Sequence, residues 1–306
     1  MASHHQQPHS PRYRGRFAPS PTGPLHFGSL VTAVGSLLEA RRHQGSWTLR
    51  IDDIDPPREA PGATDAILRT LERFGFQWDG PVVYQSRRLD LYSEALDRLR
   101  RSAYAYGCAC TRREIANVAV NGPNGLIYPG TCRQGLPPGR RTRAWRVRCD
   151  NTSIRFHDRF QGPMDTLLAE TIGDFVVRRA DGHFAYHLAA AVDDGSDGIT
   201  HLVRGCDLLW CTPPQRYLQQ LLGLPVPECG HLPIVVNRAG QKLSKQNHAP
   251  PLDIKQPEVQ VWDALAALRQ QPPAALRRGS LDMLWAWAME HWQPDAVYGL
   301  ASTATP

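Results

Sequence analysis

The chain has 306 residues, enough for one large domain or two modest ones, and its hydrophobic fraction of 42% is ample for a core. Its net charge of +6 and its sequence pI of about 9.1 suit a polyanionic partner such as nucleic acid, although many ordinary enzymes carry this charge. No stretch approaches the ~20 apolar residues of a membrane helix, which excludes an integral membrane protein built from such helices.

The amino-terminal residues 1–12 are polar and rich in His and Pro, with no apolar signal core. We therefore expect a disordered arm on a cytoplasmic protein. The chain has seven cysteines, and Cys108 and Cys110 are separated by one residue. In a chain without a secretory signal, an odd number of cysteines indicates metal ligation or free thiols rather than a disulfide framework.

The first ordered elements are a strand at 13–18 and a helix at 26–43, joined by a turn that contains Pro19, Pro21 and Gly23. The prolines forbid regular pairing in the turn, and the glycine allows tight backbone geometry. A helix that begins here presents free N–H groups and partial positive charge, which suit phosphate. From this stretch alone, a nucleotide site and a plain strand–turn–helix corner both remain open.

Strands and helices then alternate. The pattern predicts strands at 46–52 and 82–84 and helices around 63–74 and 92–99. Such β-α-β alternation indicates a parallel sheet covered by helices, in which ligands bind at the carboxyl ends of the strands. The opening turn and an acidic turn, Asp52–Glu59, both follow strands at that edge.

The alternation breaks near Gly107, where the chain becomes rich in Gly, Pro, Arg and Asn. We expect an insertion at about 103–150 that is held together by something other than a core of its own. The later elements are expected as strands at 144–148, 154–157, 175–178, 184–188, 199–204 and 231–236, a helix at 208–222, and a polar loop at 237–246.

Residues 251–306 differ in composition and are expected to form a short helical appendix on the main body. Trp262, Leu265 and Leu268 indicate one short helix. A second apolar stripe covers 281–292, with Ser280 well placed as its N-cap. The tail after Pro294 is expected to be frayed.

A loop with two lysines, Lys242-Leu243-Ser244-Lys245, follows the strand at 231–236. Alone it is typical of a solvated basic loop. Together with the opening turn, Pro19–Gly28, it resembles the "HIGH" and "KMSKS" signatures of class I aminoacyl-tRNA synthetases. The resemblance implies an α/β fold, the class I nucleotide-binding (Rossmann-like) parallel sheet, over residues 13–250.

Three longer motifs narrow the resemblance to the glutamyl/glutaminyl branch: Arg16–Gly23, Arg50–Asp55 and Val203–Leu209. A glutamyl-tRNA synthetase continues into a sizeable anticodon-binding region, whereas about fifty residues follow the lysine loop in this sequence. The chain therefore most resembles the glutamyl-Q tRNA(Asp) synthetase family. That family activates glutamate without tRNA and esterifies the queuosine base at the wobble position of tRNA(Asp).

The insertion carries Cys108, Cys110, Tyr128 and Cys132. Three thiols at this spacing are a moderate signal for zinc, and free thiols are the alternative. The resemblance implies one structural Zn²⁺ per chain on these four side chains.

For glutamate, the resemblance implies a site that faces two carboxylates and one ammonium. Carboxylates require arginine, supplied by Arg16 and Arg204. The ammonium requires an acid, and Asp52 stands where the family usually has glutamate. His187 stands where an amide is expected. The complete expected set is Arg16, Phe17, Ala18, Pro19, Ser20, Asp52, Tyr186 and Arg204.

For ATP, the resemblance implies His26, Gly28, Ser29 and Lys245, with Mg²⁺ bound alongside the nucleotide. The expected catalytic residues are His26, Lys242 and Lys245. They would steady the phosphates and the leaving pyrophosphate, since this chemistry depends on positioning and charge stabilisation.

The expected function is therefore a ligase that forms glutamyl-adenylate and then glutamylates tRNA(Asp) carrying queuosine, acting as a monomer. Three alternatives remain open: a truncated glutamyl-tRNA synthetase that charges a tRNA 3′ end, a non-catalytic RNA-binding paralogue, and a nucleotidyl transferase of the same fold. By charge alone, the candidate RNA contacts are Arg112, Arg113, Arg140, Arg141 and Arg143.

Overall fold

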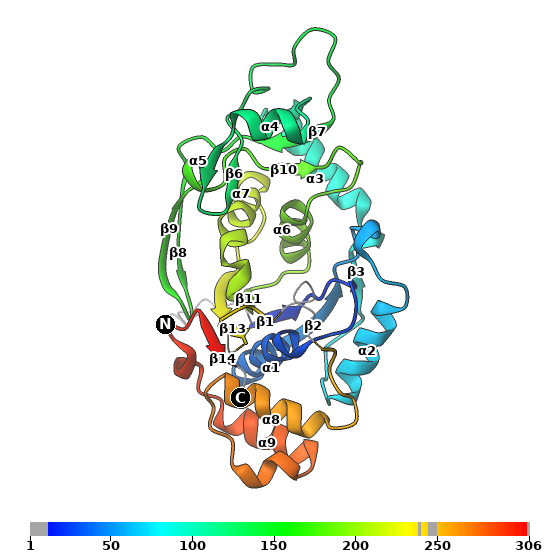
Figure 1. Cartoon of the computed structure of the whole chain (residues 1–306), viewed down its shortest axis with the longest axis vertical. Coiled ribbons are helices and arrows are strands. Elements are labelled where there is room, and N and C mark those ends of the chain that lie inside the picture. Colours follow the sequence, from blue (N-terminus) through cyan, green and yellow to red (C-terminus); the bar gives the residue numbers. More distant parts are fainter. Residues whose placement is uncertain (1–11, 238–239, 244–249, 305–306) are drawn as a thin grey trace, which may run out of the picture.

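The computed structural model describes residues 12–237, 240–243 and 250–304 (Figure 1). Residues 1–11 of the arm expected at 1–12 lie outside the described residues, as do Ser244 and Lys245. The α-helices are α1 (Phe27–Arg42), α2 (Ala63–Arg73), α3 (Leu89–Arg101), α4 (Arg112–Val118), α5 (Leu168–Thr171), α6 (Tyr186–Ser196), α7 (Thr212–Leu222), α8 (Pro257–Ala267) and α9 (Leu281–His291). None of the described helices has the length and apolar character needed to cross a membrane.

The strands fall into a central group, an outer group and short pairs. They are β1 (Arg14–Phe17), β2 (Ser46–Ile51), β3 (Val83–Tyr84), β4 (Ala105–Cys108), β5 (Val120–Gly122), β6 (Gly125–Ile127), β7 (Ala144–Val147), β8 (Ser153–Asp158), β9 (Gly162–Leu167), β10 (Val176–Arg178), β11 (His201–Gly205), β12 (Glu228–Leu232), β13 (Ile234–Val236) and β14 (Ser302–Ala304). Short 3₁₀ helices connect several of them, among which η3 (Cys206–Cys211) matters for the site.

Parallel strands form the centre of the molecule. β1 pairs with β2 and β2 with β3, while β11 pairs with β12 and β12 with β8, all in parallel. The Thr200 N–H donates to the Arg14 carbonyl at 3.0 Å, which places β11 beside β1. The strand order therefore runs in opposite directions from the boundary between β1 and β11: from β1 to β3 on one side of it, and from β11 to β12 on the other. Ligands bind at such switch points in α/β sheets.

Helix α1 is the central helix, and its predicted apolar stripe is confirmed. The stripe residues Leu30, Val31, Val34, Leu37 and Leu38 are all buried. α1 contacts β1, β2 and β11 on one face and α8 and α9 on another. Because it is enclosed on both faces, α1 is apolar almost all round, as buried helices are.

The predicted strand at 184–188 is wrong, because α6 begins at Tyr186. The stretch Leu188–Val192 is rich in alanine, the best helix former, and is fully enclosed by other elements. A short apolar run of this kind cannot be assigned to helix or strand from its periodicity.

The predicted strand at 231–236 is two strands, β12 and β13, because Pro233 lies between them and has no N–H to donate. The expectation of a frayed tail after Pro294 is also wrong. The segment β14 pairs in parallel with β13, with Thr303 opposite Val235. The sequence of β14 is short and polar, so nothing in it signals a strand.

The expected helix at 208–222 begins as the 3₁₀ helix η3 and continues as α7. Pro213 and Pro214 occupy the first turn of α7, as predicted, where a missing N–H is harmless.

Strands β4 and β7 of the insertion form a small antiparallel sheet with β10, in the order β10-β7-β4. Helix α4 and the β5–β6 hairpin cap this sheet, at the opposite end of the molecule from α8 and α9 (Figure 1). Thr111 and Glu114 form a capping box that starts α4. Its own buried cluster is small: Tyr106, Cys108, Tyr128 and Cys132.

Helices α8 and α9 complete the core around α1. The indole N–H of Trp285 donates to the Phe74 carbonyl at 2.9 Å, and that of Trp292 donates to Glu39 Oε2 at 2.7 Å. Ser280 caps α9 as predicted, because its hydroxyl accepts from the Met283 N–H. These helices therefore brace α1 on the face away from the sheet, and they contact the end of α2 through Phe74.

We predict that Trp285→Ala lowers the free energy of unfolding by about 3–5 kcal/mol, the usual loss for a buried large aromatic residue. The indole is 6% exposed and packs edge-on against Phe76, with ring centroids 5.1 Å apart. Urea unfolding followed by circular dichroism measures the change.

Met289→Ala on the same helix is the matched control, because Met289 is 47% exposed. It should change the free energy of unfolding by less than about 0.5 kcal/mol. Equal losses for the two variants would contradict a bracing role for Trp285.

Candidate active site

A cleft of about 310 Å³ opens at the carboxyl ends of β1 and β11, at the switch point of the sheet. It brings together most of the residues that the sequence singles out: Arg16, Phe17, Ala18, Pro19, Ser20, His26, Gly28, Ser29, Tyr186, Arg204 and Lys242. Asp52 is not among the lining residues. Four segments far apart in the chain therefore meet at one cleft.

His26 forms the N-cap of α1. Its Nδ1 accepts a hydrogen bond from the Ser29 N–H at 3.4 Å, which satisfies one of the free donors at the helix start. A Cβ atom on Gly28 would lie 3.2 Å from the His26 ring and 3.4 Å from the Leu243 carbonyl. Gly28 thus allows the opening turn and the lysine loop to approach closely over the helix end.

Arg16 is buried and already paired. Its Nε and Nη2 donate to the two oxygens of Asp194 at 3.1 and 3.0 Å. Asp194 also accepts from Arg50 at 2.7 Å. Burial alone would raise the pKa of Asp194, but the two guanidinium groups hold it well below its usual range. Asp194 therefore stays ionised and fixes the orientation of Arg16.

Asp52 belongs to the same buried network. Its Oδ1 accepts from Arg50 Nε at 2.7 Å, and its side chain is nearly inaccessible. Burial raises the pKa of Asp52, although Arg50 acts in the opposite direction. Its N–H donates to the Pro19 carbonyl at 3.0 Å, so the acidic turn is joined to the cleft wall.

Arg204 differs from Arg16 because only neutral groups hold it. Its nitrogens donate to His231 Nε2 (3.0 Å), Gln215 Oε1 (2.8 Å), Thr212 Oγ1 (2.7 Å) and the Tyr186 hydroxyl (3.3 Å). Arg204 is 2% exposed and forms no ion pair with any residue in the described part of the chain. A buried guanidinium without a carboxylate is an uncompensated charge that suits an anionic ligand.

His231 and Asp158 hold Arg204 from behind. His231 Nδ1 lies 2.5 Å from Asp158 Oδ2, and both side chains are fully buried. Arg204 can only donate, so His231 Nε2 must accept, and the ring proton lies on Nδ1, facing Asp158. Sequence reasoning missed Asp158, Thr212, Gln215 and His231. In the sequence, the only indication of these residues is that each is a polar side chain on an otherwise apolar strand or helix face.

Lys242 faces the cleft from the lysine loop. Its Nζ lies 2.6 Å from Asp207 Oδ2, and both side chains line the cleft. Lys245, the other expected catalytic lysine, lies outside the described residues.

His187 does not line the cleft. Its ring packs edge-on against Phe175 and Trp210, with centroids 5.7 and 5.6 Å away. Burial and the charge of Arg204 lower the pKa of His187 to about 4, so the imidazole is neutral at neutral pH. His187 is therefore an uncharged ring at the position where the family resemblance implies an uncharged amide.

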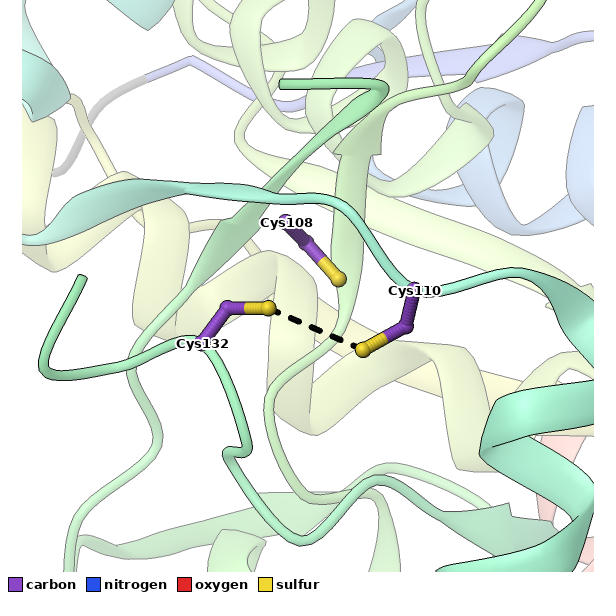
Figure 2. Close-up of side chains that lie close together, drawn as sticks. All are labelled: Cys108, Cys110 and Cys132. Carbon is purple, nitrogen blue, oxygen red and sulfur yellow. Dashed lines mark hydrogen bonds between the residues drawn. The ribbon is translucent and has the colours of Figure 1, made fainter. Parts of the chain in front are cut away.

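Three cysteine thiols of the insertion point toward one another (Figure 2). The sulfurs of Cys108, Cys110 and Cys132 lie within 4.8 Å of one another, and Cys110 Sγ is 3.6 Å from Cys132 Sγ. The Tyr128 hydroxyl lies 3.4 Å from the sulfurs of Cys108 and Cys110. A tetrahedral zinc site with Zn–S bonds of about 2.3 Å places its sulfurs about 3.8 Å apart. The cluster could therefore hold a metal ion.

Protonation at this cluster is uneven. Burial raises the pKa of Cys110 to about 11 and raises that of Tyr128 beyond its ordinary value. Burial also acts to raise the pKa of Cys132, but hydrogen bonds from Tyr128 and from the Ala109 backbone lower it overall. Cys132 therefore loses its proton more readily than Cys110.

Comparison with known proteins agrees with this geometry. Residues 12–270 match the family of class I tRNA synthetases (E and Q), catalytic domain. The glutamyl-Q tRNA(Asp) synthetase of Aromatoleum aromaticum is 56% identical over 283 residues, covering 92% of this chain and 90% of that protein. The corresponding protein of Chromobacterium violaceum is 57% identical over 285 residues, covering 93% and 95%.

Among solved structures, a glutamate tRNA ligase from Elizabethkingia meningosepticum, in complex with its amino acid, superposes with a TM-score of 0.79 at 25% identity. The match covers 96% of this chain and 67% of that one. The class I catalytic fold and the expected family are therefore both confirmed. The chain belongs to the glutamyl-Q tRNA(Asp) synthetase family of class I aminoacyl-tRNA synthetases, and it is a ligase.

Proposed function

We propose that this chain activates L-glutamate with ATP, without tRNA, and then glutamylates queuosine at the wobble position of tRNA(Asp). In the first step, an α-carboxylate oxygen attacks the α-phosphorus of ATP, and pyrophosphate leaves. In the second, a hydroxyl of the queuosine cyclopentenediol attacks the carbonyl carbon of the adenylate. An ester forms, AMP leaves, and the hydroxyl proton is released. The names of the relatives support this acceptor.

The buried charge of Arg204 is the observation that carries the proposal. It lines the cleft, is held by His231, Thr212, Gln215 and Tyr186, and has no carboxylate partner among the described residues. A substrate carboxylate would supply the missing counter-charge through forked hydrogen bonds. Because its partners fix the guanidinium in advance, little conformational entropy is lost when the carboxylate binds.

Arg16 is the candidate for the second carboxylate. Two of its nitrogens are held by Asp194, and Nη1 makes no hydrogen bond to a described residue, so it is available to a ligand. Asp52 is the candidate for the ammonium. Since its carboxylate does not line the cleft, we expect it to act through a bridging water.

For ATP, the proposal assigns the phosphates to the start of α1. The residues His26, Gly28 and Ser29 line the cleft there, and the helix dipole favours negative charge at this end. Lys242 and Lys245 would hold the leaving pyrophosphate. Mg²⁺ bound with ATP would share the charge that develops on it.

The cysteine cluster is assigned to one structural Zn²⁺. Cys108, Cys110 and Cys132 would ligate it as thiolates, and Tyr128 would be the fourth ligand. The donor set is rich in sulfur, as zinc prefers, and the site is closed to solvent because these side chains are mostly buried. The bound zinc would hold the insertion together, which has only a small apolar core of its own.

We predict that Arg204→Lys raises the KM for glutamate about 10- to 100-fold, because a hydrogen-bonded charge contributes about 1.5–3 kcal/mol. The KM for ATP should stay unchanged. Glutamate-dependent pyrophosphate exchange measures both values. Should this variant fail to fold, Tyr186→Phe keeps the ring and removes the hydroxyl beside Arg204, and a smaller rise is expected.

Lys242→Ala is the contrasting variant, because Lys242 is 39% exposed in its ion pair with Asp207 and is safely removed. It should lower the exchange rate at saturating glutamate by about 10²-fold while leaving the KM for glutamate nearly constant. An unchanged KM for glutamate in both Arg204→Lys and Tyr186→Phe would contradict the assignment of Arg204.

We predict one zinc ion per chain in the purified protein and its loss in Cys132→Ser. Tyr128→Phe should retain zinc with weaker affinity, because it removes one oxygen ligand and keeps the three sulfurs. Metal analysis and competition with a chromophoric chelator measure the two effects.

Cys206→Ser is the control for the loss of one thiol, because Cys206 is partly exposed and lies outside the cluster. It should retain the wild-type zinc content. A metal-free wild-type protein, or equal zinc content in Cys132→Ser and Cys206→Ser, would refute the zinc assignment.

The acceptor is tested by labelling tRNA(Asp), with and without queuosine, with radioactive glutamate. We expect label only on the queuosine-containing tRNA, and pyrophosphate exchange with glutamate in the absence of any tRNA. The wobble-base acceptor is rejected if both tRNAs are labelled equally. Exchange that requires tRNA, together with labelling of a 3′ end, would support a truncated glutamyl-tRNA synthetase instead.

A further inference from the structure

A second hollow, of about 1130 Å³, lies between the acidic turn after β2 and the cysteine-bearing insertion. The start of α4 and strands β7 and β10 form its other walls. Its charged lining residues are Arg58, Arg112, Arg113, Arg143, Arg146, Arg179, Asp55 and Asp181. Arginines therefore outnumber acids, and the hollow is electropositive.

Three exposed arginines of the hollow have no side-chain partner among the described residues. Arg112, Arg113 and Arg143 are exposed, and within the described ranges their side chains form no ion pair or hydrogen bond. By contrast, Asp55 holds Arg58 and Arg179 at 2.5 and 3.0 Å. The hollow thus combines two arginines that Asp55 holds in place with three arginines that are free to bind a ligand.

The floor of the hollow adjoins the cysteine cluster. Cys110 lines it, and the Arg146 guanidinium lies 3.9 Å from the centre of the Tyr128 ring. Arg146 is 8% exposed, donates to the Asp174 carbonyl, and its Nε has no partner in the part of the chain that is described. This buried cationic side chain is thus held by an aromatic ring and a backbone carbonyl rather than by a carboxylate.

The hollow is close to the glutamate cleft along two chain segments. Asp55, on its rim, is three residues from Asp52, whose N–H bonds the cleft residue Pro19. Three residues span at most about 10 Å. Asp181, which shares the Arg179 guanidinium with Asp55, is five residues from Tyr186, another cleft residue. A ligand in the hollow would therefore lie beside the adenylate.

We propose that this hollow seats the phosphate backbone of the acceptor RNA, with Arg112, Arg113 and Arg143 as the phosphate contacts. This inference rests on the proposed function, which requires an RNA loop to deliver its base to the cleft. Free arginines around a concave surface fit a curved polyanion, because each phosphate contact releases counterions from the RNA. A flat anionic membrane would reach only the rim.

The test is a triple variant, Arg112→Ala/Arg113→Ala/Arg143→Ala. It should bind an unmodified tRNA(Asp) transcript at least about tenfold more weakly, and the slope of log Kd against log salt should fall by about 2, for three lost contacts. On queuosine-containing tRNA(Asp), its KM should rise by a similar factor. Glutamate-dependent pyrophosphate exchange without tRNA should stay at the wild-type rate.

The matched control is Arg42→Ala/Arg69→Ala/Arg278→Ala, which removes the same charge from exposed arginines of other elements. Equal effects of the two triple variants on RNA binding, or no effect of the first, would overturn the proposal. Binding of the wild-type protein to phosphatidylserine vesicles but not to tRNA would also overturn it. The binding assay needs no turnover, so it remains decisive even if queuosine is not the acceptor.

Discussion

The buried ion network around Asp194 is the interaction on which the cleft depends. Asp194 on α6 binds Arg16 of β1 and Arg50 of β2 at once, and Arg50 also binds Asp52. The neighbouring Asp193 accepts from Gln85, Arg88 and Tyr92 in the same layer. Removing one member would leave buried charges uncompensated, which typically costs about 3–5 kcal/mol. The network thus locks the two strand ends and α6 into one arrangement.

Two arginines of the cleft consequently have different roles. Arg16 is neutralised by Asp194, so it contributes position and shape with little net charge. Arg204 is held by His231, Thr212 and Gln215, which are neutral, so its charge stays available. A site with two uncompensated guanidiniums would be costly to bury, whereas a site with none would not attract the anionic amino acid of the proposed function. The cleft solves this conflict by neutralising one of the pair within the protein.

The sequence predicts the parts of the fold and the site that local chemistry determines. The turn Pro19–Gly28, the stripe of α1 and the Ser280 cap each follow from spacing and turn residues, and the structure confirms those elements. The spacing of the cysteines also indicates their cluster. The partners of Arg16 and Arg204 are long-range, since Asp194 and His231 lie 178 and 27 residues away, respectively. The prediction of a strand at 184–188 does not indicate that Asp193 and Asp194 follow on the same helix. The strand β14 forms only because it pairs with β13, which its local sequence does not indicate.

The proposed chemistry needs two surfaces of opposite character in contact. The two arginines of the cleft are buried, Arg16 in an ion pair and Arg204 among neutral acceptors, so salt screens them little. The arginine-lined hollow is open, and three of its cations face solvent, where screening is strong. The acidic turn joins the two, because Asp52 belongs to the buried network and Asp55 holds Arg58 and Arg179. One short segment therefore fixes the cleft, where the amino acid would be activated, relative to the hollow where a polyanion could dock, and the proposed transfer reaction requires that this distance be constant.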